Sequence, residues 1–459
     1  MLSMAAMAAR YMYLIFLLIF MAAGAYIYKR GGSAGGSREM GRYQTAAWIL
    51  LNLTSCVLWY LRAQEQKDFS GFWLSVGLYG GVLLLLWLEG RLICKNQARL
   101  LWNCVLMLVS IGMTVLWRLD PEGARRQLVW LYVCAAVTGG VSLVSRGGWF
   151  WKIPAWLYFA VGAVLLLLPF AFPLAAGGAL NWTDIGGIHF QPSELVKLCW
   201  AFYLAVLYSR EKRVLSVGRA LAAYALVALV LLKQNDLGAL LIFGVLLWLM
   251  TFLYGKKNYI LWGGAAAALL AAVAAYFLVG HVRVRFDAWL DPWKDVTGGG
   301  YQIAQSLFAI AGGGWLGAGL YQGQPGYIPE RTTDMIFAAI TEEFGVLFSI
   351  LLAGLYLLMV LTAFRGAERE KEPVRRNVFI ALGLLLGTQS FLIMAGSIKL
   401  LPLTGVTLPF ISYGGSSLLS SFILAGVLQQ LLGSQTEEGG KSRVKKEKPI
   451  EEFRFEEPF

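Results

Sequence analysis

Apolar stretches long enough to cross a lipid bilayer recur along this 459-residue chain, from Tyr11 almost to the C-terminus. The hydrocarbon core of a bilayer is about 30 Å thick, so a spanning helix needs roughly 20 mainly apolar residues. Because 58% of the residues are hydrophobic and only 14% are charged, the chain belongs in a membrane. Backbone groups in lipid must be hydrogen-bonded within the segment, so these runs predict an all-α polytopic membrane protein.

Charged residues bound thirteen such runs, each of which predicts one spanning helix. The predicted spans are 11–28, 44–61, 70–88, 100–117, 127–145, 154–173, 193–209, 218–235, 237–254, 259–279, 335–361, 378–396 and 409–432. Basic residues occur in alternate connections, such as Arg91 to Arg99 and Arg365 to Arg376. Because positively charged loops stay in the cytoplasm, we expect an outer N-terminus, a cytoplasmic C-terminus and outer segments at 174–192 and 280–334.

The composition argues against several classes of function. The net charge of +12 is spread over short loops, so nucleic-acid binding is not predicted. Five cysteines without CxxC spacing predict packing residues. With His189 and His281 as the only histidines, a histidine metal site or a Ser-His-Asp triad lacks its side chains. We therefore expect no cofactor and no protein metal ligands, and leave open a divalent cation that assists the reaction.

The outer segment 280–334 is too long for a simple connection between neighbouring spans, and such loops are usually functional. It contains RVRFDAWLDPWKDVTGGGYQ at 283–302, a glycine-rich turn at 312–314 and YIPERTTD at 327–334. Its aromatic residues would also suit a plain aromatic belt at headgroup depth. The apolar run 301–310 is too short to span, so it is predicted to lie in the interface or to re-enter the membrane.

Charged residues also occur in or beside the predicted spans, where they are costly in lipid. These pairs are Glu194 with Lys197, Lys233 with Asp236 at the outer end of a hairpin, and Glu342 with Glu343. The structural alternative for each pair is helix–helix pairing inside the bundle. We favour that alternative for Glu342 and Glu343, and both interpretations stay open for Glu194 and Lys197, which share one helix face.

Five motifs follow one another between Arg99 and Leu432. They are Trp182, FQPSELVK at 190–197, DVTGGGYQ at 295–302, IPERTTDMIF at 328–337 and LPLTGVTLPFISYGGSS at 401–417. The last is long and specific, whereas GGSS alone would indicate only close helix packing. In these motifs and their order the chain resembles the shape, elongation, division and sporulation (SEDS) family, whose members include FtsW, RodA and SpoVE.

The resemblance implies a domain organisation. Residues 99–433 are similar to the ten-helix core of the family, with 280–334 as its large extracellular loop. Residues 1–98 form an N-terminal extension with about three extra transmembrane helices, which the resemblance does not explain. Residues 434–459 are charged and have little to bury, which predicts a disordered cytoplasmic tail.

The chain departs from the family pattern at three positions. Asn235 replaces the proline of the family's QPDLG, Val296 replaces the proline after the loop aspartate, and Asn181 replaces a basic residue before Trp182. The resemblance therefore does not predict the backbone at these positions.

The resemblance implies a peptidoglycan glycosyltransferase that polymerises lipid II at the outer face of the bacterial cytoplasmic membrane. The transfer would be inverting, with undecaprenyl diphosphate leaving. The attacking sugar hydroxyl must lose a proton, which a carboxylate can accept. The alignment assigns this role to Asp295, with Asp291 as the alternative. The leaving diphosphate needs positive charge or oriented donors.

The other predicted site residues bind substrate or shape the cleft. Lys197, Lys233 and Arg331 are the candidate cations for the diphosphate. Glu194 and Lys197 are assigned to the cleft, together with Trp182 from the family motif. Glu330, Arg331 and Asp334 are expected to order the loop. The segment from Ser412 to Ser417, with Ser416, is expected mainly to shape the helix packing beside it.

Two further functions are weighed against polymerisation. A lipid II flippase needs a polar path across the bilayer, whereas the polar residues here gather on the outer side. A scaffold that only recruits partners would not need Asp295. The family also implies a class B penicillin-binding protein as the transpeptidase partner, and this chain has no serine motif for that reaction.

Overall fold

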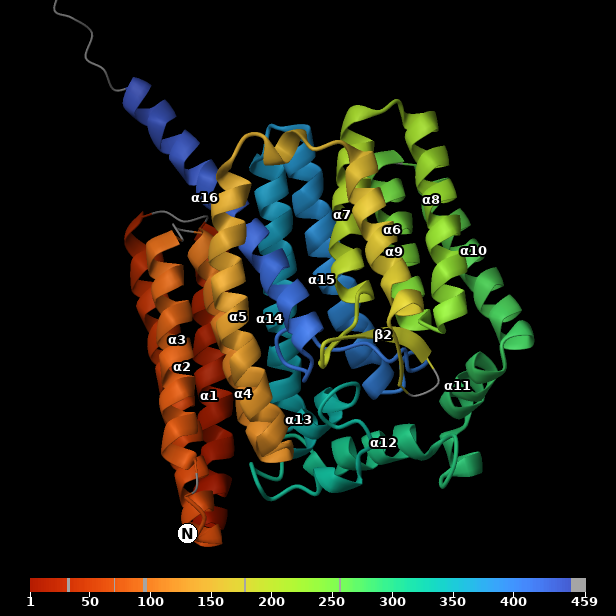
Figure 1. Cartoon of the computed structure of the whole chain (residues 1–459). Coiled ribbons are helices and arrows are strands. Elements are labelled where there is room, and N and C mark those ends of the chain that lie inside the picture. The colour runs from red at the N-terminus through yellow and green to blue at the C-terminus, as the bar shows by residue number, and fades with distance from the viewer. Residues whose placement is uncertain (31–33, 70, 94–96, 177–178, 256, 447–459) are drawn as a thin grey trace, which may run out of the picture.

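The computed structural model describes residues 1–30, 34–69, 71–93, 97–176, 179–255 and 257–446. The described chain is a bundle of helices with one small sheet (Figure 1). Eleven of its helices are long and apolar enough to cross a membrane, and α6 (Ala155–Ala171) and α7 (Ser193–Arg210) pack beside them. Each of the thirteen predicted spans therefore contains a helix, and the all-α polytopic membrane fold is confirmed.

Three helices come first in the chain. They are α1 (Leu2–Arg30), α2 (Ala34–Gln66) and α3 (Phe72–Ile93). The other spanning helices are α4 (Gln97–Leu119), α5 (Pro121–Arg146), α8 (Arg213–Gln234), α9 (Leu237–Gly255), α10 (Asn258–Leu278), α14 (Val346–Arg369), α15 (Pro373–Ser397) and α16 (Gly415–Lys446). In an 18-residue apolar stretch of α4, 94% of the residues are buried, whereas no residue of α10 is buried. Helix α4 is thus the centre of the bundle and α10 lies at its edge.

Buried hydrogen bonds join the N-terminal extension to the core. Asn52 of α2 donates to Ser110 of α4 (3.0 Å) and accepts from the hydroxyl of Tyr79 in α3 (2.5 Å). Ser55 of α2 bonds to the hydroxyl of Thr114 in α4 (2.9 Å). Polar contacts of this kind stabilise helix pairs where no water competes for them. The extension is therefore an integral part of the bundle.

The two long outer segments have secondary structure of their own. Residues 173–190 form an antiparallel sheet of β1 (Pro173–Ala176), β2 (Ala179–Ile185) and β3 (Ile188–Phe190), in that order. The larger segment contains α11 (Gly280–Leu290), the 3-10 turn η2 (Pro292–Asp295), α12 (Tyr301–Gly313) and the 3-10 turn η3 (Pro325–Tyr327), and α13 (Ile336–Phe344) follows it. Figure 1 shows α12 lying across the ends of the spanning helices, in agreement with the short apolar run predicted there.

Three predicted boundaries were wrong. The span 335–361 is broken at Gly345, whose φ is +89° and whose Cβ position would overlap the backbone of 315–317. The span 409–432 begins at Gly415, because residues 408–414 form a turn. Helix α16 continues to Lys446, so the predicted disordered tail does not begin at 434; residues 447–459 lie outside the described residues.

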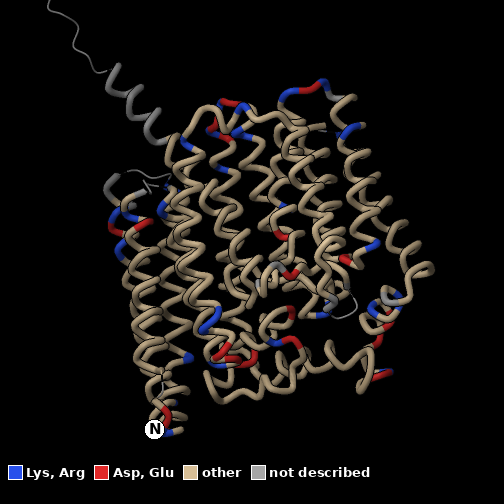
Figure 2. The backbone as a smooth tube through the Cα atoms, in the orientation of Figure 1, with Lys and Arg blue, Asp and Glu red and all other residues tan. Residues whose placement is uncertain are grey.

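The two ends of the bundle differ. The N-terminus lies at the end that carries α11, α12 and α13, and α16 leaves at the other end (Figure 1). Charged residues concentrate toward these two ends, with few between them (Figure 2). This arrangement agrees with the prediction that the N-terminus and residues 280–334 share one side of the membrane and the C-terminal helix reaches the other.

Candidate functional site

Asp295 lies in a glycine-rich turn between η2 and α12. Its Oδ2 accepts a hydrogen bond from the Gly299 backbone N–H (2.7 Å), and its carbonyl oxygen accepts one from Gly300 (3.0 Å). A Cβ on Gly298 would overlap the Asp295 carboxylate, and one on Gly300 would overlap the carbonyl oxygen of Pro292. The Asp295 side chain is exposed. Glycine is thus needed for the turn to close around an aspartate that still faces solvent.

Two departures from the family pattern have a backbone explanation. Val296 has φ −65° and ψ −22°, and −65° is the φ at which the proline ring is locked. The turn after Asp295 therefore has the backbone that a proline would give. Asn235 ends α8 at φ +58°, which proline cannot adopt and which asparagine tolerates better than most residues.

Asp291, the alternative base, caps a turn. Its Oδ1 accepts a hydrogen bond from the Trp293 backbone N–H (3.1 Å) at the start of η2. Asp287, one helical turn earlier, accepts a hydrogen bond from the Tyr276 hydroxyl (3.1 Å). Asp291 is exposed, so the geometry leaves it accessible as well.

Residues 328–335 form a tight turn ahead of α13. Glu330 has φ +48°, an uncommon backbone for a residue other than glycine. Its carbonyl oxygen accepts hydrogen bonds from the Thr333 and Met335 backbone N–H groups (3.1 and 3.0 Å), and its Oε2 accepts one from the Thr333 hydroxyl (3.0 Å). Arg331 makes only a long contact, from Nη1 to the Gly326 carbonyl (3.5 Å). Glu330 therefore closes this turn.

The 328–335 turn is tied to the segment before α16. The Tyr413 backbone N–H donates to the Thr332 carbonyl, and the Ser412 hydroxyl donates to the Thr333 carbonyl, both at 2.8 Å. Gln127 of α5 in turn donates to the Ser412 carbonyl (3.2 Å). Ser416 is buried at the first turn of α16. The motifs at 328–337 and 401–417 thus meet at this turn, where the bonded residues Thr333 and Ser412 are 79 positions apart in the chain.

Asp334 faces Arg285, a residue of α11 that sequence reasoning did not select. A Cβ placed on Gly405 would lie 3.6 Å from Asp334 Oδ2 and 3.8 Å from Arg285 Nη2, so both side chains meet at this glycine. Arg285 Nη1 also donates to the Leu403 carbonyl (3.4 Å). The pKa of Asp334 is raised to about 7, mainly by burial and also by the charge of Glu330, while the charge of Arg285 acts in the opposite direction.

An apolar cavity of about 780 Å³ opens beside Arg285. Its lining comes from α9, α10, α11, α14, α15 and residues 401–404, and includes Trp248, Phe286, Trp289, Phe364 and Phe391. Arg285 is the only charged residue among those described as lining it. The described lining of the cavity is thus mainly apolar, with one cation, Arg285, which lies toward the end of the bundle that carries the outer loop.

The turn of Asp295 and the cavity share α11. A Cβ on Gly299 would lie 3.3 Å from Val284 Cγ1, so the turn packs directly on the residue that precedes Arg285. The structure therefore brings Asp295, Glu330, Arg331 and Asp334 into one outer-loop assembly around α11.

Glu194 and Lys197 lie apart from that assembly, in the centre of the bundle. Lys197 Nζ donates to Glu194 Oε1 (2.7 Å) and to Gln389 Oε1 of α15 (2.9 Å). Glu194 Oε2 accepts from the Ser420 hydroxyl of α16 (3.1 Å). Both side chains are buried and adjoin a cavity of only about 10 Å³, no larger than a water molecule requires. This geometry is that of helix–helix pairing among α7, α15 and α16.

Asp236 connects the small sheet to the start of α9. Its Oδ2 accepts hydrogen bonds from Ser193 (2.9 Å), Asn181 (3.2 Å) and Gln191 (3.3 Å). Its Oδ1 accepts one from the Ala239 backbone N–H (3.0 Å). Asn181, which replaces a basic residue, is therefore a partner of Asp236.

Two other predicted site residues lie near Asp236. Trp182 is half-buried in β2, opposite Leu174 of β1. Lys233 is exposed near the end of α8. No contact joins either of them to the Asp295 turn within the described residues.

Glu342 and Glu343 hold the loop between α12 and α13. Glu343 Oε1 pairs with Arg118 of α4 (3.0 Å) and accepts from the Tyr321 backbone N–H (3.2 Å). Glu342 Oε1 accepts from the Gln324 backbone N–H (2.7 Å). Glu343 thus makes the helix pairing that was favoured, and both residues also bind loop backbone. Within the described residues, no group of three or more His, Cys, Asp or Glu side chains comes together as metal ligands would.

Comparisons with known proteins agree with this arrangement. Residues 92–437 match the family described as Cell cycle protein, FtsW/RodA/SpoVE. The chain is 40% identical over 265 residues to a probable peptidoglycan glycosyltransferase FtsW of Geobacter sulfurreducens, covering 55% of this chain and 70% of that one. It is 31% identical over 406 residues to the peptidoglycan glycosyltransferase RodA of Mycobacterium bovis, covering 81% and 86%.

Two solved structures have a similar fold. One is a chain of a peptidoglycan synthase complex described as coordinating polymerization and crosslinking, with a TM-score of 0.59, 28% identity and coverage of 73% of this chain and 97% of that one. The other is the rod shape determining protein RodA of Thermus thermophilus, with a TM-score of 0.55, 25% identity and coverage of 72% and 95%.

Proposed function

The chain belongs to the FtsW/RodA/SpoVE family of cell cycle proteins, and we propose that it is a peptidoglycan glycosyltransferase that polymerises lipid II. The observation that supports this proposal most is the joint position of Asp295 and the apolar cavity on α11. A lipid-linked sugar has a hydrocarbon tail, a diphosphate and a saccharide. The cavity would bind the tail, Arg285 would bind the diphosphate, and the Asp295 turn would face the saccharide.

The apolar cavity suits the polyisoprenoid tail of the substrate. Its volume of about 780 Å³ is within the range of protein sites that bury hydrophobic ligands. Its location among α9, α10 and α15 lets a tail enter from the lipid, because α10 buries no residue and lies at the edge of the bundle.

Arg285 is a candidate partner for the diphosphate. A guanidinium can donate two parallel hydrogen bonds to a phosphate, and Arg285 is exposed where the cavity meets the outer loop. Charge develops on the diphosphate as it leaves, so a fixed cation there lowers the barrier. Arg331 and Lys233 remain additional candidates, whereas Lys197 is already occupied by Glu194 and Gln389.

Asp295 is the proposed general base. The attacking sugar hydroxyl transfers its proton to the carboxylate as the new glycosidic bond forms and the bond to undecaprenyl diphosphate breaks, with inversion at the anomeric carbon. One carboxylate oxygen of Asp295 is held by Gly299, which orients the side chain and leaves the other oxygen for the proton.

The location and partner follow from the same proposal. The loop and the N-terminus would face the outer side of the bacterial cytoplasmic membrane, where lipid II is consumed. The transpeptidase would be a class B penicillin-binding protein, because the similar complex is described as coordinating polymerization with crosslinking. The flippase alternative is less well supported, because the buried charges Glu194 and Lys197 are paired beside a cavity of about 10 Å³.

The first experiment compares Asp295→Asn with Asp291→Asn. The purified protein, together with its penicillin-binding protein, is given fluorescent lipid II, and glycan strands are resolved on a gel with and without a chelator. We expect strands from wild type and Asp291→Asn, and at least a hundredfold fewer from folded Asp295→Asn, as for loss of a general base. Normal strands from Asp295→Asn would refute the assigned base, and none from the partnered wild type would refute polymerisation. A loss of strands with the chelator would indicate that a divalent cation assists.

A further inference from the structure

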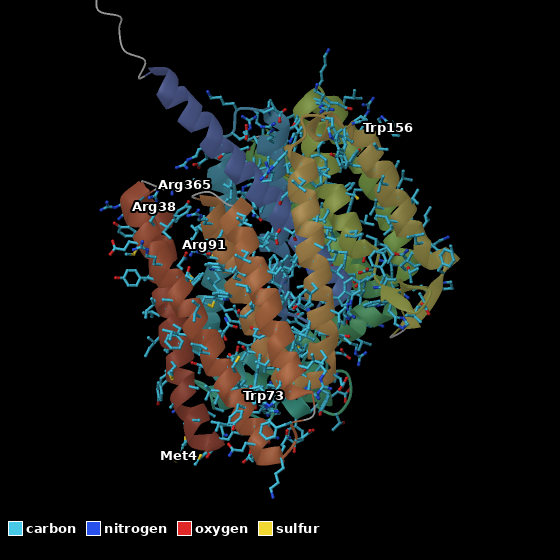
Figure 3. The ribbon with its side chains drawn as sticks, turned by 60° about the vertical axis from the view of Figure 1, so that its left-hand side comes forward. Met4, Arg38, Trp73, Arg91, Trp156 and Arg365 are labelled. Carbon is cyan, nitrogen blue, oxygen red and sulfur yellow. The ribbon has the colours of Figure 1, made fainter. Side chains whose placement is uncertain are left out.

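A second cavity, of about 180 Å³, lies among α1, α2, α3 and α4, at the end of the molecule opposite the outer loop. Four arginines line it: Arg38 and Arg42 of α2, Arg91 of α3 and Arg99 of α4. No aspartate or glutamate is among its described lining residues. Figure 3 shows Arg38 and Arg91 at this end of the extension, far from Met4 at the other end.

Three of the four arginines have no carboxylate partner in the described part of the chain. No ion pair of the described part joins Arg38, Arg42 or Arg91 to an acidic residue. Arg91 makes a long hydrogen bond to the Thr45 hydroxyl (3.5 Å) and lies over the Trp87 ring, 4.9 Å from its centroid. Like charges around one small space repel each other, and a bound anion would offset this repulsion.

The inner wall of the cavity is rigid and partly polar. The buried Gln44 accepts a hydrogen bond from Asn103 of α4 (3.0 Å) and donates to the Phe20 carbonyl of α1 (3.4 Å). A Cβ on Gly90 would overlap the Trp102 indole, whose N–H donates to the Leu86 carbonyl (2.7 Å). The close α3–α4 approach at Gly90 therefore shapes the cavity.

The rest of the lining is apolar, with Ile27, Leu100 and Leu106 beside the arginines. The positive-inside rule explains basic residues in the cytoplasmic connections, but it does not require them to share one cavity. Here they converge from three helices on one cavity that also has two amide side chains in its lining. Basic pockets between transmembrane helices bind the phosphates of lipid headgroups, and arginine matches phosphate with two parallel donors.

We propose that this cavity binds the phosphoryl group of an anionic ligand, with Arg38, Arg42, Arg91 and Arg99 as its cationic wall. The apolar lining favours an anionic phospholipid headgroup over a soluble phosphate as the source. The site lies in the N-terminal extension and the first turn of α4, and it does not depend on Asp295 or on the polymerase reaction.

The test uses the full chain purified in detergent. Native mass spectrometry measures the binding of added phosphatidylglycerol, with zwitterionic phosphatidylcholine for comparison, and a thermal-shift series measures inorganic pyrophosphate. The variant is Arg38→Gln/Arg42→Gln, because both side chains are exposed and the replacement leaves the packing of the wall intact. The control is Lys371→Gln/Arg376→Gln, which removes the same charge from two exposed positions, one just before α15 and one in its first turn. Arg91→Gln is a second variant.

We expect wild type to bind phosphatidylglycerol about tenfold more tightly than phosphatidylcholine, and Arg38→Gln/Arg42→Gln to lose that preference while the control retains it. Stabilisation by pyrophosphate that is lost in the variant, without a lipid preference, would support the phosphoryl site with a soluble source. If both arginine variants bind phosphatidylglycerol and pyrophosphate as wild type does, the proposal is refuted.

Discussion

At the scale of single residues, the backbone around Asp295 determines how its carboxylate is presented. The side chain accepts from Gly299, and its own carbonyl accepts from Gly300. The position of the Asp295 carboxylate therefore depends on the backbone of the glycines at 298–300. A sequence motif gives their identity but not that geometry. Two of them, Gly298 and Gly300, have no room for a side chain.

Gly300→Ala should disrupt this turn. Its Cβ would overlap the carbonyl oxygen of Pro292 and lie 2.9 Å from that of Asp295, so the turn must open and move the carboxylate. We expect glycan-strand formation to fall at least tenfold in a folded protein. The matched control is Gly312→Ala in α12, where a Cβ would meet no atom within 4 Å and activity should persist. Equal activity of both variants would contradict the role given to the turn.

Asp334 predicts a particular dependence of stability on pH. Its pKa is about 7 in the folded protein and about 3.9 in an unfolded chain, so the folded state binds the proton more tightly. The resulting stabilisation is complete below about pH 4 and is lost as the pH rises toward 7. We expect the midpoint of thermal unfolding to fall between about pH 4 and pH 7 in wild type, and to change little from this group above that range.

Asp334→Asn should lose most of that fall, because its amide does not titrate. Asp291→Asn, which changes an exposed carboxylate of the same loop, should keep it. Identical pH profiles for wild type and Asp334→Asn, measured by thermal unfolding in matched buffers, would show that Asp334 does not cause the dependence.

At the scale of elements, the N-terminal extension contacts the outer loop directly. Arg10 of α1 donates to the Gly317 carbonyl (2.8 Å), and the Tyr13 ring packs edge-on against Phe344 of α13, with centroids 5.0 Å apart. Arg62 of α2 lies over the Tyr321 ring, 5.6 Å from its centroid. Helices α1 and α2 therefore support the connection from α12 to α13.

Arg10→Ala should loosen that connection. A hydrogen bond from a charged donor contributes roughly 1.5–3 kcal/mol, which is about tenfold or more in a local opening equilibrium. We expect about tenfold faster limited proteolysis within 315–324, with a smaller loss of strand formation. Lys29→Ala, at the other end of α1 and exposed, removes the same charge and should leave the cleavage rate unchanged. An unchanged rate in Arg10→Ala would mean that α1 does not hold the loop.

At the scale of the whole molecule, the bundle separates two surfaces. The end with α11, α12 and α13 carries the Asp295 turn, the side chains of Asp334 and Arg285 beside Gly405, and the mouth of the apolar cavity. The opposite end carries the arginine-lined cavity of the extension. Between them, Glu194 and Lys197 are paired inside the bundle. A polymerase that works at one membrane face needs this separation, whereas a flippase needs a polar connection between the faces.

The sequence by itself determined the membrane class, the family and the presence of a helix in each predicted span, because apolar length and long motifs are local properties of the chain. It also predicted the outer loop, together with Asp295, Glu330 and Asp334 as members of it. It did not determine the break at Gly345 or the start of α16 at Gly415. Tertiary structure alone decided that Arg285 and Asp334 both lie beside Gly405, that Asp236 binds the small sheet, and that Arg10 reaches Gly317. These contacts join residues far apart in the chain, so no local pattern encodes them. For the same reason the sequence alone could not show that Glu194 and Lys197 are already paired with α15 and α16, away from the outer loop.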